Sequence, residues 1–201
     1  MSRPAHVIRF SLTVAAVAAS IPPLNGILTG HMLTHMLVQI PLVFACAATW
    51  GTSVRWRVDA PWLRWNIQGV PGLLLSAFVL TYWMTPIALD HATADGAWDL
   101  AKILSLGLAG AAAGVSWRLG SAVVQVFYVG NMLWMMGTAG LLYQNTDERL
   151  CNAYLWNDQL ETGEGLVAVS ILCACVVLLI AVRTRRRHPP LSVPAPASPA
   201  P

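Results

Sequence analysis

The chain has 201 residues, of which 56% are hydrophobic and only 10% are charged. Soluble domains carry about 25% charged residues, so a soluble chain of this composition would expose a large apolar surface, and lipid is the expected solvent. The formal net charge of +3 is too small to indicate nucleic acid binding, and the four cysteines lack the paired spacing of a disulfide scaffold. The composition therefore predicts an all-α, polytopic membrane helix bundle.

About six transmembrane helices are expected, because a helix needs about 20 predominantly apolar residues to cross the hydrocarbon core. The first segment, 8–24, also looks like a cleavable signal peptide, since basic residues precede its short apolar stretch. We favour a retained helix. Five stronger segments follow, and residues 189–201 form a Pro/Ala-rich tail that is predicted to be disordered, leaving 1–188 as the bundle. The five stronger segments are 27–50, 68–89, 100–117, 120–142 and 165–182.

The distribution of charges predicts the orientation of these helices. Of the 12 lysines and arginines, all except Lys102 and Arg149 lie at one set of helix ends and loops. The acidic residues, with the exception of Asp59, lie at the opposite set. Cytoplasmic loops carry the excess of lysine and arginine, so both termini are predicted to be cytoplasmic and the acidic loops to face outward.

The most informative motif is HMLTHM at the outer end of the second segment. In a regular α-helix His31 and His35 share a face one turn apart, and Met32 and Met36 repeat this spacing on the adjoining face. Polar groups inside a membrane are costly and need a partner or a function. Imidazole together with thioether suits copper, the cuprous ion above all. Alternatively, the methionines fill space between helices and the histidines form interhelical hydrogen bonds.

Further candidate copper ligands lie at the same outer level. Met84 lies near the end of the third segment and His91 just beyond it, and Met132 and Met136 lie one turn apart on the fifth. Ordinary packing is the alternative explanation for the methionines of the fifth segment. No Ser/His/Asp set or carboxylate pair lies inside the membrane, so the sequence gives no support for an enzyme.

Three other features are expected to be structural. Lys102 follows Asp99 by one turn, and an ion pair between them would relieve the cost of a lysine near the membrane edge. Gly110 and Gly114 allow close contact with a neighbouring helix. Cys151 lies in the outer loop 143–164, where an unpaired, inert thiol is expected.

The stretch HMLTHMLVQIPLVFACA (31–47) resembles the CtaG-type cytochrome c oxidase assembly factors, which are multi-helix membrane proteins with a His-Met-x-x-His motif followed by apolar residues and a proline. The match continues more loosely through TYWMTPIALDHA (81–92), and the family commonly has an Asp-Gln before its last helix. In length and motif order the resemblance covers most of the chain, and its first motif is the specific one. It points to His31, Met32, His35, Asp158 and Gln159 as functional residues.

The resemblance implies a multi-pass protein of the bacterial inner membrane that assists copper insertion into a haem–copper cytochrome c oxidase. Its partner would be an oxidase subunit or a periplasmic copper donor. The family usually has a histidine where this chain has Met84 and another near Lys102, so the chain would be a divergent member. Two alternatives stay open: a b-type haem cytochrome ligated through His91 with His35 or His31, and a metal-free membrane transporter or structural subunit.

Overall fold

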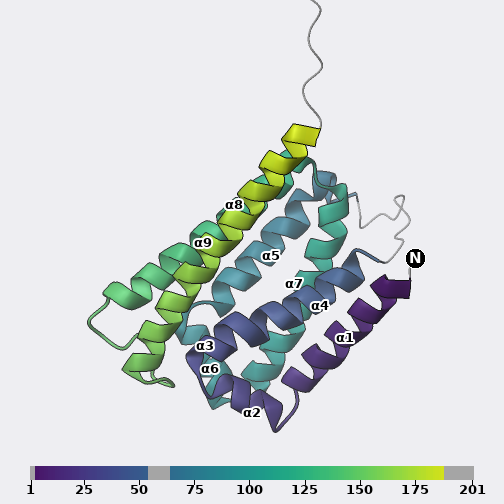
Figure 1. Cartoon of the computed structure of the whole chain (residues 1–201). Helices are drawn as coiled ribbons and strands as arrows, with labels where there is room; N and C mark the ends of the chain where they lie inside the picture. The colour runs from purple at the N-terminus through teal and green to yellow at the C-terminus, as the bar shows by residue number, and fades with distance from the viewer. Residues whose placement is uncertain (1–2, 54–63, 188–201) are drawn as a thin grey trace, which may run out of the picture.

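The computed structural model describes residues 3–53 and 64–187, and every element in these ranges is a helix (Figure 1). The predicted tail 189–201 lies outside the described residues. The elements are α1 (Arg3–Ala19), α2 (Leu24–Thr29), α3 (Met32–Thr34), the π-helix η1 (His35–Gln39), α4 (Ile40–Gly51), the 3-10 helix η3 (Ile67–Gly69), α5 (Val70–Trp83), α6 (Pro86–Ala94), α7 (Gly96–Leu119), α8 (Ala122–Asn145) and α9 (Trp156–Arg187).

Four helical stretches in the described ranges are long and apolar enough to cross a membrane: Met32–Gly51, α7, α8 and Trp156–Thr184. A fifth span results if the bent pair formed by Ile67–Trp83 and α6 is counted as one. α1, which corresponds to the predicted segment 8–24, has 17 residues and is shorter than these stretches. The all-helical architecture with several helices able to span a membrane is thus confirmed, whereas six spans and cytoplasmic termini stay predictions.

Two predicted segments are broken rather than continuous. The helix expected over 27–50 stops after α2, and His31 has extended backbone angles (φ −123°, ψ 135°) before α3 begins. The helix expected over 68–89 bends by 71° between α5 and α6. Thr85, which precedes Pro86, has ψ 144°, because a residue before proline is pushed out of the helical region.

The tight crossing of α4 and α7 forms the centre of the bundle (Figure 1). A Cβ atom at Gly110 would clash with the carbonyl of Phe44, and one at Gly114 would clash with the carbonyl of Ala48. The predicted role of these two glycines in close helix packing is confirmed. This crossing fixes α4, into which the His–Met segment leads directly, against α7.

α8 and α9 run side by side as a hairpin along the remaining helices (Figure 1). α9 begins at Trp156, so part of the outer loop predicted over 143–164 is helical. Between Ile171 and Val182 the residues of α9 are exposed and almost all apolar. Lipid is the natural solvent for such a surface, because a water-soluble protein rarely exposes so large an apolar area.

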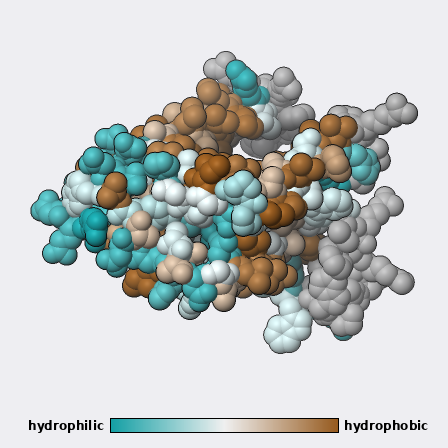
Figure 2. Space-filling model, turned by 90° about the horizontal axis from the view of Figure 1, so that it is seen from below, coloured by the Kyte–Doolittle hydropathy of each residue, from teal (hydrophilic) through white to brown (hydrophobic). Residues whose placement is uncertain are grey.

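We call the end at which α2, α6 and the α8–α9 loop lie the acidic end. Seen from this end, hydrophilic residues gather on one side of the molecule and apolar residues lie along its flanks (Figure 2). The described acidic residues are Asp90, Asp95, Asp99, Asp147, Glu148, Asp158, Glu161 and Glu164. Exposed Arg64, Arg118 and Arg183 lie toward the opposite end.

Candidate functional site

A single π-helical turn places the polar side chains of the His–Met segment. The N–H of Ile40 donates to the carbonyl of His35, five residues earlier rather than four. Pro41, the next residue, has no N–H and cannot continue the regular hydrogen-bond pattern of an α-helix. Single π-helical turns inside α-helices are frequent at functional sites. The turn directs His35, Met36 and Gln39 into the interior, where all three are fully or almost fully buried.

The ammonium group of Lys102 is the centre of a buried polar cluster. Its Nζ lies 2.7 Å from His35 Nε2 and 2.9 Å from Gln39 Oε1. It also forms an ion pair with Asp99, with Nζ 2.7 Å from Oδ1. The pairing predicted between Lys102 and Asp99 is confirmed. The ammonium thus hydrogen-bonds to two neutral side chains and pairs its charge with a carboxylate, although Lys102 is completely buried.

A second layer of hydrogen bonds holds the acceptors in place. Gln39 Nε2 donates to the carbonyl of Ala19 (2.8 Å) and to Asn25 Oδ1 (2.6 Å). Asn25 Nδ2 in turn donates to Asp99 Oδ2 (2.8 Å). Lys102, Gln39, Asn25 and Asp99 therefore form a closed ring of side chains that ties α1, α2, η1 and α7 together.

His35 continues this network toward the acidic end. Its Nδ1 lies 2.7 Å from the hydroxyl of Tyr154, and that hydroxyl donates to the carbonyl of Thr29 (3.0 Å). Because Nε2 accepts from Lys102 and the tyrosine proton is used on Thr29, the pattern assigns the ring proton to Nδ1. Both ring nitrogens of His35 are thus occupied by groups of the protein.

His31 does not join this cluster. The residue immediately precedes α3 in extended conformation, and its side chain is 70% exposed. Its Nδ1 lies 3.5 Å from Asp158 Oδ1, at the acidic end. The arrangement predicted for His31 and His35, two imidazoles on one helical face, is therefore not formed, because a chain break and a π-turn replace the regular helix on which the prediction depended.

The methionines divide into a buried group and a peripheral one. Met32, Met36 and Met84 belong to one apolar core, and Met136 packs against it from α8. Met132 is half-buried and is not part of that core. These contacts are those of packing side chains, which matches the alternative that the sequence left open.

His91 lies on the surface of α6, where its ring stacks on Trp98 with centroids 5.0 Å apart. The residue is exposed, whereas His35 is completely buried and engaged at both nitrogens. A haem held by two histidines needs them to face one another across the macrocycle. The structure does not bring these two histidines, or His31 and His91, together in that way.

Of Asp158 and Gln159, the pair to which the family resemblance points, Gln159 holds the α8–α9 loop. Buried Gln159 accepts from the N–H of Leu150 (2.9 Å) through Oε1 and donates to the carbonyl of Tyr143 (3.2 Å) through Nε2. Asp158 faces His31, as described above. Gln159 therefore positions the backbone of the α8–α9 loop, and Asp158 lies against exposed His31.

Asp90 fixes the same loop from α6. Its carboxylate accepts from the N–H of Asn152 (2.9 Å), from the side-chain amide of that residue (3.1 Å) and from the N–H of Ala153 (3.0 Å). Between these contacts Cys151 is buried and its thiol points to the carbonyl of Pro86, with 3.8 Å between sulfur and oxygen. Burial, with a smaller contribution from the charge of Asp90, raises the pKa of the Cys151 thiol to about 12. A protonated, buried thiol agrees with the predicted inert cysteine.

The residues present do not fit a copper ion in this arrangement. A metal at Nε2 of His35 would have to displace the ammonium of Lys102, which already supplies a positive charge there. Nδ1 is held by Tyr154, and exposed His31 lies outside the cluster. In the ranges 3–53 and 64–187, no group of three His, Cys, Asp or Glu side chains is arranged so that it could hold a metal.

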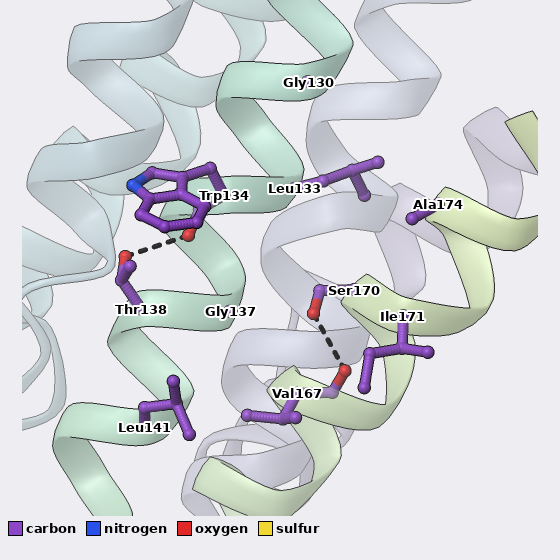
Figure 3. Close-up of a pocket in the computed structure, with 10 residues that line it drawn as sticks. All are labelled: Gly130, Leu133, Trp134, Gly137, Thr138, Leu141, Val167, Ser170, Ile171 and Ala174. Atoms are coloured by element: carbon purple, nitrogen blue, oxygen red, sulfur yellow. Dashed lines mark hydrogen bonds between the residues drawn. The ribbon is translucent and has the colours of Figure 1, made fainter. Parts of the chain in front are cut away.

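An apolar groove of about 470 Å³ lies between α8 and α9 (Figure 3). Its two hydroxyl-bearing residues, Thr138 and Ser170, both donate to carbonyls of their own helices, those of Trp134 (2.9 Å) and Val167 (2.8 Å). No charged or metal-binding side chain lines the groove. Its chemistry suits a lipid acyl chain and offers nothing to a polar ligand.

Two members of the buried cluster were not among the residues singled out from the sequence. Asn25 follows Pro22 and Pro23 in a short turn between apolar segments, and Tyr154 lies in the acidic loop far along the chain. For Asn25 the available signal was a polar residue without an evident partner at the membrane level expected for Lys102. Nothing local in the sequence indicated that Tyr154 would reach His35.

The comparisons with known proteins give no relatives. No family model, no curated protein and no solved structure matches the chain. The likeness to the CtaG-type assembly factors therefore rests on the motifs quoted from the sequence.

Proposed function

We propose that this protein is a multi-pass accessory factor of the bacterial inner membrane that assists the assembly of a haem–copper oxidase, as the CtaG-type resemblance implies. In this proposal it acts as a docking scaffold through its acidic end, which faces outward, and it holds no copper at His35. The partner is an oxidase subunit or a copper donor with a basic surface, since complementary charges steer and orient association.

The main support for the docking role comes from the contacts that fix the acidic end to the bundle. The α8–α9 loop is held by Asp90 at residues 152 and 153, and by Gln159 at Leu150. Tyr154 anchors it to the buried cluster. Loops usually lie on the surface and are mobile. Because several side chains fix this loop, we infer that its shape is needed for docking.

The charge on that fixed surface indicates the chemistry of the partner. Asp147, Glu148 and Glu161 are exposed on and beside the loop. For none of their carboxylates do the described residues supply an ion pair or a side-chain hydrogen bond. Their charges are therefore available to a basic partner. Because exposed charges act mainly on the rate and specificity of association, docking through them would weaken as the salt concentration rises.

The alternatives from the sequence receive less support from the geometry. Copper handling would require His35 to exchange Lys102 for the metal. A haem cytochrome would require a second axial ligand that faces His35. A transporter would require a polar site open to substrate, whereas the side chains of the buried cluster face one another in the interior.

The test is a deletion strain complemented with variants, in which the level of assembled oxidase is measured by its haem spectrum and by its copper content. Neutralising the exposed acids (Asp147→Asn, Glu148→Gln and Glu161→Gln together) should reduce assembled oxidase several-fold, with normal amounts of the variant in the membrane. Asn157→Gln, a conservative change of an exposed residue at the same end, is the matched control and should complement fully.

Two results would contradict the proposal. Unchanged oxidase in the deletion strain would favour a transporter or a structural subunit. Purified protein that holds about one cuprous ion per chain, lost in a His31→Ala/His35→Ala double variant, would restore the copper-handling function in place of the scaffold.

A further inference from the structure

The space between η1 and α7 is organised around a positive charge. Three acceptors converge on one point: His35 Nε2, Gln39 Oε1 and Asp99 Oδ1 lie 2.7, 2.9 and 2.7 Å from Lys102 Nζ. For Asp99 Oδ1, which is buried, the described residues supply no hydrogen bond. The ammonium is therefore the group that balances this oxygen. We propose that Lys102 acts as a tethered cation, and that His35, Gln39 and Asp99 form a binding site for a small primary ammonium ion.

The acceptors are held independently of the lysine. Gln39 is fixed by the carbonyl of Ala19 and by Asn25, and Asn25 also binds the second oxygen of Asp99. His35 is fixed through its other nitrogen by Tyr154. A site whose parts are positioned by other contacts should keep its shape when the lysine side chain is shortened.

The number and type of acceptors select the ligand. A primary ammonium has one positive charge and N–H donors without an acceptor, which matches two hydrogen-bond acceptors and one carboxylate oxygen within ion-pair distance. A tetraalkylammonium ion has no N–H and cannot replace it. Copper prefers imidazole and thioether, but only one imidazole faces this point. Because the positive charge of Lys102 already lies at His35 Nε2, the His–Met segment does not fit an external metal ion.

Removing the lysine side chain beyond Cβ allows the proposal to be tested. Lys102→Ala deletes three methylene groups and the ammonium, which together correspond to n-propylammonium. The full-length variant in nanodiscs would be heated while tryptophan fluorescence is followed, with n-propylammonium chloride replacing tetramethylammonium chloride at constant ionic strength. The unfolding midpoint should fall in the variant and rise again by roughly 5–10 °C when the amine is present at about one hundred times its Kd.

Two controls separate binding at this site from a general effect of the amine. The wild-type protein, whose site is filled, should show no rise in midpoint. Lys102→Met fills the same space without a charge and should also show none. Equal midpoints of Lys102→Ala in n-propylammonium and in tetramethylammonium would overturn the proposal. So would a midpoint that cuprous copper raises and n-propylammonium does not, because the site would then be a metal site.

A second comparison applies if Lys102→Ala does not fold. Lys102→Met leaves the carboxylate of Asp99 without its counter-charge, whereas Lys102→Met/Asp99→Asn removes both charges. Because an uncompensated buried charge is strongly destabilising, the double variant should unfold at a higher temperature than Lys102→Met. A double variant with an equal or lower midpoint would show that the ammonium does not balance Asp99, and the proposal would fail.

Discussion

The hydroxyl of Tyr154 joins the loop of the acidic end to the buried cluster, so its removal should loosen both. Tyr154→Phe keeps the ring and deletes two hydrogen bonds, one with His35 Nδ1 (2.7 Å) and one with the carbonyl of Thr29 (3.0 Å). Each is worth about 0.5–1.5 kcal/mol, and a buried donor left unpaired costs about 1–3 kcal/mol. We therefore expect the free energy of unfolding to fall by about 2–4 kcal/mol.

The assay is reversible unfolding in mixed micelles as the fraction of denaturing detergent is increased, with the transition followed by tryptophan fluorescence. Tyr82→Phe is the matched control, because the Tyr82 residue is 46% exposed and its hydroxyl makes no hydrogen bond in the described part of the chain. Its effect should stay below about 0.5 kcal/mol, as for most surface substitutions. Equal losses for the two variants would refute the reasoning, since they would show that the buried hydroxyl contributes no more than an exposed one.

Two further predictions concern the packing of the helices and the cysteine of the acidic end. Gly114→Ala should destabilise the protein by about 1–3 kcal/mol in the same assay, because the added methyl group meets the carbonyl of Ala48. Gly107→Ala, where a Cβ atom has nothing within 4 Å, should be neutral or stabilising by up to about 1 kcal/mol. A larger loss of stability in Gly107→Ala than in Gly114→Ala would contradict the described crossing of α4 and α7. Alkylation of Cys151 in the folded protein, measured by mass spectrometry, should accelerate with pH until about pH 12. The reason is that burial raises the pKa of this thiol to about 12 and only the thiolate reacts. An alkylation rate that levels off near pH 9 would refute this prediction.

The sequence allowed the class of fold and several local contacts to be predicted. Long apolar runs predict helices in lipid, since a spanning backbone must satisfy its own hydrogen bonds. The pair of Lys102 with Asp99 and the close approach at Gly110 and Gly114 follow from residue types and spacing within one helix. Such features depend on helical geometry alone, so they do not need the tertiary structure.

The arrangement of the candidate site could not be predicted in the same way. The prediction for His31 and His35 assumed a regular helix, and both the extended backbone at His31 and the π-turn at His35 change the direction of the side chains. Pro41 and the residue pair Thr85-Pro86 mark the places where regular geometry fails, but not the angle that results. The contacts of Lys102 with Gln39, and of His35 with Tyr154, join residues more than 60 positions apart, and no local pattern encodes them.

The bend at Pro86 has a consequence for the bilayer around the protein. α5 has 14 residues and at about 1.5 Å per residue it measures only about 21 Å, less than the ~30 Å thickness of the hydrocarbon core. α9, with 32 residues, measures about 48 Å on the same basis. Lipids beside α5 must therefore thin while those beside α9 need not, so headgroups and water would dip toward α6 on one side of the molecule. Because α6 packs against α7, the helix that carries Lys102 would then border the thinned part of the bilayer.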